Sequence, residues 1–468
     1  MKKNLFISFL FLIQGAVATA QNNNIYGYDA DLLPGSFFKE RRELLREKLP
    51  ENAIAVLFSN PIKNRANDVD YDYHQDPNFY YLTGFREPNA VIVILKNKIL
   101  FRNVMTNEIL FISDGDEKKE IWTGRKAGIH DAAFISSMSS IFLTEDFIND
   151  TVLFSDTNSI VLSLQHFKGI EDDKKNSADL HEIDNHFQQI ISKTGVSFDD
   201  FKLKKILASL REVKTQEELK LIAKSVNITC EGFREMMKKV QLSSTEYQIQ
   251  AEGEYVFKKL GAEMLGYSSI CGSSGNSCIL HYTFNRRPFA KGDLVLLDMG
   301  AEYHGYSADV TRTIPINGKF SNEQKLIYEL VLKAQNTAIN ECQVGNQFKA
   351  PHEAAVKIIS IGLVQLGVIK DPNDYKTYFM HSTSHYLGLD VHDPGNYGPL
   401  SNGNVITVEP GIYIPENSDC DKKWWNIGVR IEDDILIRPT GPINLSELAP
   451  RNIDEIEKLT SKNSFINK

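Results

Sequence analysis

The sequence predicts two domains, an N-terminal α/β domain and a C-terminal α+β domain. Three observations support this fold class. The chain has 468 residues, and a typical domain has about 100–200. Helical and strand patterns alternate in the first half, as in a layered α/β domain. In the second half, helices and strands occur in groups, as in an α+β domain. We assign residues 21–202 to the first domain and residues 203–468 to the second.

Residues 1–20 have the pattern of a secretory signal peptide. Lys2 and Lys3 precede an apolar run at residues 5–13, and Ala18 and Ala20 form a small-residue cleavage site. A retained anchor helix is the alternative, but the run is short for a membrane span. We therefore expect an exported protein, periplasmic or secreted, with no membrane segment after cleavage.

Hydrophobic periodicity predicts the elements of the N-terminal domain. Residues 37–49 have the spacing of an amphipathic helix, and residues 171–176 form a charged loop. Short apolar runs indicate buried strands at residues 53–58, 90–95, 99–101 and 109–112.

The C-terminal domain begins with helical patterns and continues with strands and further helices. The predicted helices are residues 203–210, 217–239, 246–260, 322–339 and 354–366. The predicted strands are residues 294–297, 308–314, 405–408, 412–414 and 428–437.

Composition excludes several classes of protein. The formal net charge is −9, which disfavours a nucleic-acid-binding protein. Five cysteines, with no Cys-x-x-Cys pair, do not form a disulfide framework. Most are expected to be buried thiols, with a Cys271–Cys278 disulfide as the alternative. Apolar residues make up 42% of the chain, which provides a core that a disordered protein lacks.

Two aspartates flank a predicted hairpin. Asp298 ends an apolar strand, and Asp309 lies in the next strand, beyond the turn-forming residues 300–305. A turn centred on Tyr303 and His304 would place the two carboxylates directly opposite each other, with Cβ atoms about 5 Å apart. Such a pair needs a proton or a metal between its members. A different register, with one aspartate capping a turn, is the alternative.

The same pattern recurs with two glutamates. Glu409 follows the strand at residues 405–408, and Glu432 lies within the strand at residues 428–437. A hairpin centred near residues 420–421 would again place the acids opposite each other. An acid in an apolar strand is rarely left unpaired. A salt bridge between Arg430 and Glu432 is the other interpretation.

Histidines complete this set of polar residues. His381, His385 and His392 lie within one short segment, and His281 follows a Gly/Ser-rich stretch. The residue after His381 is not glutamate, so the segment is not the helical His-Glu-x-x-His zinc motif. Three histidines in one segment, with four strand acids elsewhere, indicate a metal ligand and acid–base groups.

Charge balance favours two metal ions. Four carboxylates match two divalent cations, and one imidazole adds a neutral ligand. Oxygen-rich sites with one nitrogen suit Mn²⁺, with Zn²⁺, Co²⁺ and Fe²⁺ also possible. Paired metals can hold a bridging water and lower its pKa, which makes hydrolysis the expected reaction class.

Several motifs resemble those of the pita-bread metallopeptidases, in particular the Xaa-Pro aminopeptidase (aminopeptidase P) branch. They are His-x-x-Ser-His-Tyr-x-Gly-Leu-Asp-Val-His-Asp at residues 381–393, Thr-Val-Glu-Pro-Gly-Ile-Tyr at 407–413 and Val-Arg-Ile-Glu-Asp-Asp at 429–434. In the N-terminal half, Phe-Tyr-Tyr-Leu-Thr-Gly-Phe at 79–85 and Glu-Ile-Trp-Thr-Gly-Arg at 120–125 are similar to that family.

The resemblance implies a role for each site residue. The implied metal ligands are Asp298, Asp309, His385, Glu409 and Glu432. Glu409 is also the implied proton shuttle, with His281 and His392 at the scissile carbonyl or the tetrahedral intermediate. His381, Tyr413 and Arg430 are expected to line the prolyl side of the pocket.

Two residues of the N-terminal domain, Asp68 and Trp122, are expected to close the substrate's N-terminal side. The resemblance suggests that they act from a neighbouring subunit, so a homo-oligomer is expected.

The resemblance implies an Xaa-Pro aminopeptidase, which removes any N-terminal residue that precedes proline. Its expected partners are peptides with proline at the second position. Prolidase, which cleaves Xaa-Pro dipeptides only, is the alternative in the same class. A non-catalytic pita-bread binding module is the alternative in another class.

Overall fold

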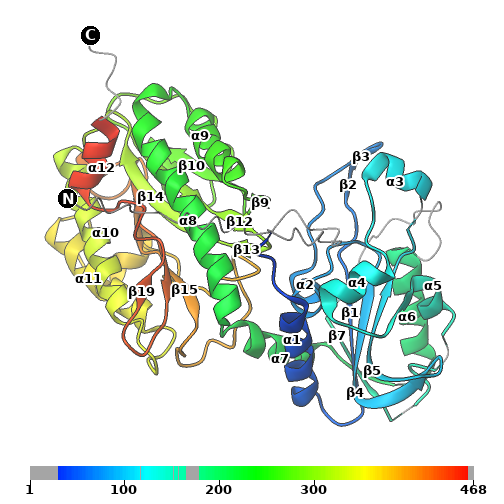
Figure 1. Cartoon of the computed structure of the whole chain (residues 1–468). Coiled ribbons are helices and arrows are strands. Elements are labelled where there is room, and N and C mark those ends of the chain that lie inside the picture. Colours follow the sequence, from blue (N-terminus) through cyan, green and yellow to red (C-terminus); the bar gives the residue numbers. More distant parts are fainter. Residues whose placement is uncertain are drawn as a thin grey trace, which may run out of the picture.

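The computed structural model describes residues 30–115, 117–150, 152–156, 158–164, 179–194 and 196–461. These residues form two lobes joined where helix α7 (Asp200–Arg211) leads toward helix α8 (Gln216–Lys239), as Figure 1 shows. The predicted signal peptide at residues 1–20 and the predicted loop at 171–176 lie outside the described residues.

The N-terminal lobe is built on a mixed six-stranded sheet in the order β6-β5-β4-β1-β7-β8. Strands β1, β4 and β5 are antiparallel neighbours, whereas β6, β7 and β8 join in parallel. The helices of this lobe are α1 (Gly35–Lys48), α2 (Pro77–Thr83), α3 (Glu117–Thr123), α4 (Ile129–Ser136), α5 (Thr144–Ile148) and α6 (Leu180–Thr194). The strands are β1 (Ala53–Phe58), β2 (Asn64–Ala66), β3 (Val69–Asp70), β4 (Val91–Phe101), β5 (Val104–Ile112), β6 (Ile141–Leu143), β7 (Ile160–Ser163) and β8 (Ser197–Asp199).

The strands predicted at residues 90–95 and 99–101 are one strand, β4. Its pairing with β5 shifts register between Ile94 and Ile99. The polar residues of this segment interrupt the apolar pattern without ending the strand, because a bulge absorbs the extra residues. The prediction of two separate strands is therefore wrong.

The C-terminal lobe contains several short antiparallel sheets and helices that pack on them. Its remaining helices are α9 (Glu246–Lys259), α10 (Asn322–Asn340), α11 (Ala350–Gln365) and α12 (Ile453–Thr460). Its strands are β9 (Met264–Leu265), β10 (Ile270–Ser273), β11 (Leu294–Met299), β12 (Ala301–Tyr303), β13 (Tyr306–Ser307), β14 (Val310–Pro315), β15 (Val405–Val408), β16 (Gly411–Ile414), β17 (Ile427–Arg430), β18 (Asp433–Leu436) and β19 (Ile443–Asn444).

Helix α8 begins at a capping box, which explains why the predicted helix starts where it does. The Thr215 hydroxyl accepts a hydrogen bond from the Glu218 amide at 3.2 Å, and the Glu218 carboxylate accepts one from the Thr215 amide at 2.8 Å. The helix then packs against β12, β13 and β14. It therefore supports the two strands that flank Asp309, β13 and β14.

The strand predicted at residues 428–437 is split. Strand β17 ends at Arg430 and pairs with β16, whereas β18 begins at Asp433 and pairs with β15. Glu432 lies between the two ladders and forms an isolated bridge to Thr311 of β14. The break lets one segment join two sheets, and it brings Glu432 to the neighbouring hairpin.

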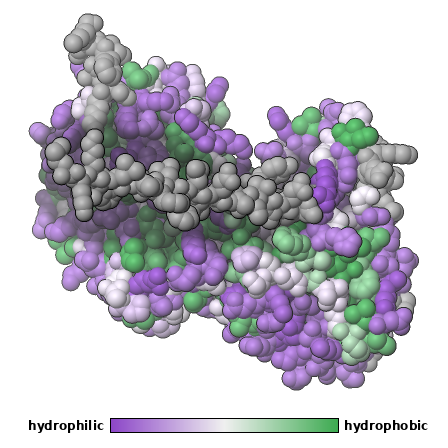
Figure 2. Space-filling model, viewed as in Figure 1, coloured by the Kyte–Doolittle hydropathy of each residue, from purple (hydrophilic) through white to green (hydrophobic). Residues whose placement is uncertain are grey.

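None of the helices in the described ranges has both the length and the apolar character that a membrane crossing needs. On the face drawn in Figure 2, hydrophilic residues are spread over both lobes.

All five cysteines are free, so the alternative of a Cys271–Cys278 disulfide is wrong. Three of the five thiols are buried, as the sequence predicts for most of them.

Candidate active site

The predicted site residues from the C-terminal half, except the buried Tyr413, meet at a cavity of about 600 Å³. The five predicted metal ligands line it, together with His281, His381, His392 and Arg430. Strand ends and loops provide these side chains from segments more than a hundred residues apart in the chain. The cavity is therefore a product of the tertiary fold.

The aspartate pair meets diagonally. Asp298 of β11 lies opposite Thr311 of β14, and Asp309 lies two residues before Thr311. The turn is at His304 and Gly305, because Tyr303 pairs with Tyr306. The prediction of direct opposition is therefore wrong: the turn centre moves by one residue, so the partner of Asp298 moves by two. Residues two apart share one face of a strand, so both carboxylates still enter the cavity.

Tyr267 connects the two aspartates. Its hydroxyl lies 2.5 Å from Asp298 Oδ1 and 2.6 Å from Asp309 Oδ1. One hydroxyl hydrogen cannot donate to both carboxylates at once. Burial and the adjacent carboxylates raise the pKa of Tyr267 well above its usual value, so the hydroxyl stays protonated and orients the pair.

The glutamate pair has the predicted register. Gly411 pairs with Arg430 on one side of the two acids, and Val408 pairs with Asp433 on the other. The register is the same in both ladders, so Glu409 and Glu432 lie opposite each other between them. Glu432 also accepts a hydrogen bond from the Thr311 hydroxyl at 2.6 Å, which fixes its carboxylate next to β14.

His385 presents its Nε2 atom to the acids. Its Nδ1 lies 3.0 Å from the Tyr386 carbonyl oxygen, to which it donates, so Nε2 is the nitrogen that can bind a metal once it is deprotonated. Nε2 lies 3.3 Å from Asp309 Oδ2 and 3.6 Å from Glu409 Oε1. His385 thus bridges the aspartate and glutamate halves of the site.

These residues fit divalent cations. Asp309, His385 and Glu432 each offer a ligand atom, and these atoms all lie within 4.8 Å of one another. Burial raises the pKa of Glu432 well above its usual range, and the charges of Asp309 and Glu409 add to this effect. Carboxylates that cannot ionise together in a buried cavity are compensated by bound cations. The donor set therefore matches an oxygen-rich metal site with one imidazole.

A chain of polar contacts leads from the acids to the predicted prolyl side of the pocket. Arg430 Nη2 lies 2.5 Å from Asp298 Oδ2, and Arg430 Nη1 donates to the Tyr413 hydroxyl at 3.0 Å. That hydroxyl lies 2.8 Å from His381 Nε2. Arg430 thus forms its ion pair with Asp298. The alternative of a salt bridge between Arg430 and Glu432 is therefore wrong.

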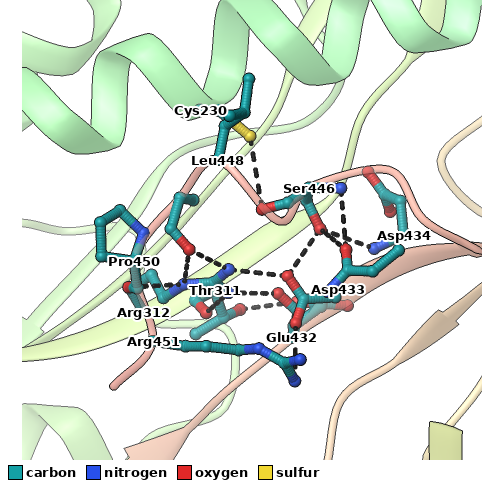
Figure 3. A network of polar contacts seen from close by, with 12 residues as sticks. Cys230, Thr311, Arg312, Glu432, Asp433, Asp434, Ser446, Leu448, Pro450 and Arg451 are labelled. Carbon is teal, nitrogen blue, oxygen red and sulfur yellow. Dashed lines mark hydrogen bonds and ion pairs between the residues drawn. The ribbon is translucent and has the colours of Figure 1, made fainter. Parts of the chain in front are cut away.

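A second arginine fixes the backbone behind the site. Arg312 is fully buried, forms an ion pair with Asp433 at 2.7 Å and donates to the Glu432 carbonyl at 2.5 Å (Figure 3). It also donates to the carbonyls of Ala449 and Pro450. Figure 3 shows this guanidinium among backbone oxygens from separate segments. The contacts hold the break between β17 and β18, where Glu432 lies, in one conformation.

Asp434 supports the other half of the site. Its Oδ2 accepts a hydrogen bond from the Asp309 amide at 3.1 Å. The carboxyl group is buried, and burial raises its pKa well above its usual value. Its contact with the backbone of Asp309 ties β18 to the start of β14.

Two predicted substrate-binding residues lie elsewhere in the described chain. Asp68 is exposed in the turn between β2 and β3, and Trp122 of α3 is 88% exposed. Neither is among the residues that line the cavity. Their predicted action from a neighbouring subunit stays a prediction.

Sequence reasoning missed Tyr267 and Thr311. Thr311 is two residues beyond Asp309 in a strand, so period-two alternation was a usable signal. Tyr267 precedes β10, whose pairing with β11 brings it to the aspartates, and nothing local in the sequence indicates that contact.

An oxygen-rich cavity with one central imidazole and further histidines on its wall defines the class of a metal-dependent hydrolase. Two family models match the chain: metallopeptidase family M24 over residues 220–439, and the aminopeptidase P N-terminal domain over residues 38–159.

Three similar proteins share nearly their full length with this chain. Xaa-Pro aminopeptidase of Haemophilus influenzae is 37% identical over 91% of this chain and 97% of its own length. The structure of Pseudomonas aeruginosa aminopeptidase PepP has a TM-score of 0.83 and 32% identity, and the match covers 93% of this chain and 99% of that one. Zinc-substituted Escherichia coli aminopeptidase P in complex with product has a TM-score of 0.81 and 32% identity, over 92% and 99% of the two chains.

The chain belongs to metallopeptidase family M24, in the branch that carries an aminopeptidase P N-terminal domain. Membership confirms the predicted pita-bread fold of the C-terminal domain and implies a divalent-metal site.

We predict that metal binding releases protons. In the metal-free protein, burial raises the pKa of Glu409 to about 7. Burial disfavours a charged His385, but its hydrogen bond to Asp309 and the nearby carboxylates outweigh this and raise the pKa to about 9. Both groups must lose any proton before they can bind a cation. The affinity for Mn²⁺ should therefore weaken as the pH falls from about 8 to about 6.

Isothermal titration calorimetry in buffers of different ionisation enthalpy measures both the affinity and the protons released. The variant His281→Ala is the matched control, since His281 lines the cavity outside the predicted ligand set. An affinity that does not depend on pH, with no proton release, would contradict the assignment.

Proposed function

We propose that this chain is a metal-dependent aminopeptidase that hydrolyses the bond between any N-terminal residue and a following proline. The observation that carries the proposal is the convergence of Asp298, Asp309, His385, Glu409 and Glu432 on one cavity. The similar proteins include Xaa-Pro aminopeptidases of Haemophilus influenzae and Escherichia coli, which supports the same reaction for this chain.

We propose two Mn²⁺ ions as the native cofactor, because carboxylate oxygens outnumber the single imidazole nitrogen in the ligand set. Asp309, His385, Glu409 and Glu432 would hold one ion, and Asp298, Asp309 and Glu432 the other. When bound, such a pair activates water for attack and polarises the scissile carbonyl.

Glu409 is suited to move the proton that hydrolysis releases. Its carboxylate lies within 3.6 Å of both His381 Nδ1 and His385 Nε2. A carboxylate so placed can accept a proton from the attacking water and return it to the leaving group. The nitrogen of the cleaved bond departs as an amine, so its departure requires a proton.

The cavity wall can recognise substrate through the shape of an uncharged ring, that of His381. Burial and the charge of Arg430 lower the pKa of His381 to about 4, so this ring is neutral at physiological pH. Its Nδ1 donates to the Ser382 carbonyl oxygen at 2.7 Å, and its Nε2 accepts from the Tyr413 hydroxyl. The ring is thereby fixed for shape recognition of a prolyl group. His281 and His392 line the same cavity and would donate to a peptide carbonyl.

We predict that Mn²⁺-reconstituted protein cleaves Xaa-Pro-Xaa tripeptides after the first residue. It should prefer proline over alanine at the second position by at least about tenfold in kcat/KM, since the pocket recognises the ring. Mass spectrometry of the released residue, with Zn²⁺ reconstitution run in parallel, measures both selectivity and metal preference.

The same assay separates the alternatives. Cleavage of an Xaa-Pro dipeptide with the tripeptide left intact would indicate prolidase. No turnover of any peptide, with less than one metal equivalent per chain by elemental analysis, would indicate a non-catalytic binding module.

We propose that the protein is exported, on the basis of the charged and apolar pattern of residues 1–20. In the native cell, the protein outside the cytoplasm should begin at Gln21. N-terminal sequencing of the purified native protein measures this, and a chain that retains residues 1–20 would contradict export by signal cleavage.

A further inference from the structure

One loop of the C-terminal lobe carries two of the site histidines. This histidine loop, residues 385–393, has His385 near its start and His392 near its end, and both line the cavity. The loop is closed by a bridge between Tyr386 and Asp393, in which the Asp393 amide donates to the Tyr386 carbonyl at 2.9 Å. It has no helix, so other contacts must fix its shape.

The carboxylate of Asp393 fills the inside of the loop. It is 1% exposed and accepts a hydrogen bond from the Asp390 amide at 3.2 Å. Gly388 lies against it so closely that an added Cβ would be 2.7 Å from Asp393 Oδ2. The glycine is thus required by the close approach of the carboxylate, and the loop conformation depends on where Asp393 lies.

Two buried cations outside the loop hold this carboxylate. Arg211, the last residue of α7, places Nη2 2.5 Å from Asp393 Oδ1 and 2.8 Å from Asp390 Oδ2. Lys214 places Nζ 2.9 Å from Asp393 Oδ2. Burial opposes ionisation of Asp393, but the two cations outweigh it and lower its pKa below the usual range. A carboxylate buried without such partners would be strongly disfavoured.

Arg211 also reaches the N-terminal lobe. Its Nη1 donates to Asn78 Oδ1 of α2 at 2.8 Å, and Lys214 donates to the Arg211 carbonyl at 2.5 Å. The same guanidinium therefore contacts both α2 and the histidine loop. None of these groups lines the metal cavity.

We propose that Arg211 and Lys214 are positioning residues for peptide cleavage: they hold Asp393, and through it they place His392 at the cavity. The proposal rests on the proposed aminopeptidase function, in which His392 contacts substrate. His392 is the residue next to Asp393, and its ring packs edge-on against His385 with the ring centres 4.5 Å apart. A shift of the carboxylate therefore moves His392 relative to the metal ligands.

A double-mutant cycle tests whether the effect passes through His392. The variant Lys214→Met removes the charge and keeps most of the side-chain length. It should lower kcat on an Xaa-Pro-Xaa peptide by about 10–100-fold, since small displacements of a catalytic group cost this much. In the His392→Ala background, the same change should lower kcat by less than about threefold, because the coupled group is already gone.

Two further variants serve as controls. Lys204→Met makes the same replacement at an exposed position of α7 and should leave kcat unchanged. Lys214→Arg keeps the charge and should retain most of the activity. Elemental analysis should find the same metal content in all variants. If Lys214→Met does not fold, Asp393→Asn, which removes the charge at the other end, enters the same cycle.

Several outcomes would overturn the proposal. Effects of Lys214→Met that multiply with those of His392→Ala would show that Lys214 acts independently of His392. An unchanged kcat in Lys214→Met would also overturn the proposal. So would a loss of bound metal in that variant.

A readout that needs no turnover separates this proposal from the proposed function. In protein labelled with ¹³C at histidine Cε1, the signal of His392 is identified by its loss in His392→Ala. Lys214→Met should shift that signal, and Lys204→Met should leave it in place. A signal unmoved by Lys214→Met would overturn the proposal even if the unaltered protein cleaved no peptide.

Discussion

Repulsion between buried carboxylates is the constraint on which the site depends. At about 4 Å, two like charges repel by about 4 kcal/mol at an effective dielectric of about 20. Four acids converge on one cavity with a single imidazole among them, and in the metal-free protein burial leaves Glu432 and Glu409 with raised pKa values. Bound cations compensate the repulsion between the carboxylates. Protons also reduce the repulsion, but they remove the negative charges that bind the cations.

The scaffold is organised to keep these acids together against their repulsion. Two hairpins deliver them in pairs, and Glu432 joins the hairpins through its bridge to Thr311. Arg312 and Asp434 then fix the backbone of Glu432 and Asp309 from behind. Buried ion pairs of this kind contribute little net stability, because desolvation offsets the attraction. Their contribution here is a defined geometry for the strand ends.

The sequence predicted much of the site because its signals are local. Apolar strands that carry an acid, repeated in two hairpins, are enough to indicate Asp298, Glu409 and Glu432 as site residues. The resemblance to a known family added the assignment of individual roles. The order of most helices and strands of the C-terminal half was equally readable, because their periodicity is strong.

The sequence could not supply contacts that depend on tertiary register. The turn between Asp298 and Asp309 is displaced by one residue from its expected centre, because Tyr303 pairs with Tyr306. Tyr267 contacts both aspartates because β10, which follows it, pairs with β11. No local sequence pattern indicates that pairing. No local pattern marks Arg211 and Lys214, yet both are buried against Asp393.

The most direct test of this account is anomalous diffraction from crystals grown with Mn²⁺. The account predicts two strong peaks about 3.5–4 Å apart, with Asp309 and Glu432 contacting both. A single peak far from these residues, or a cavity whose acids remain together with no cation among them, would contradict it.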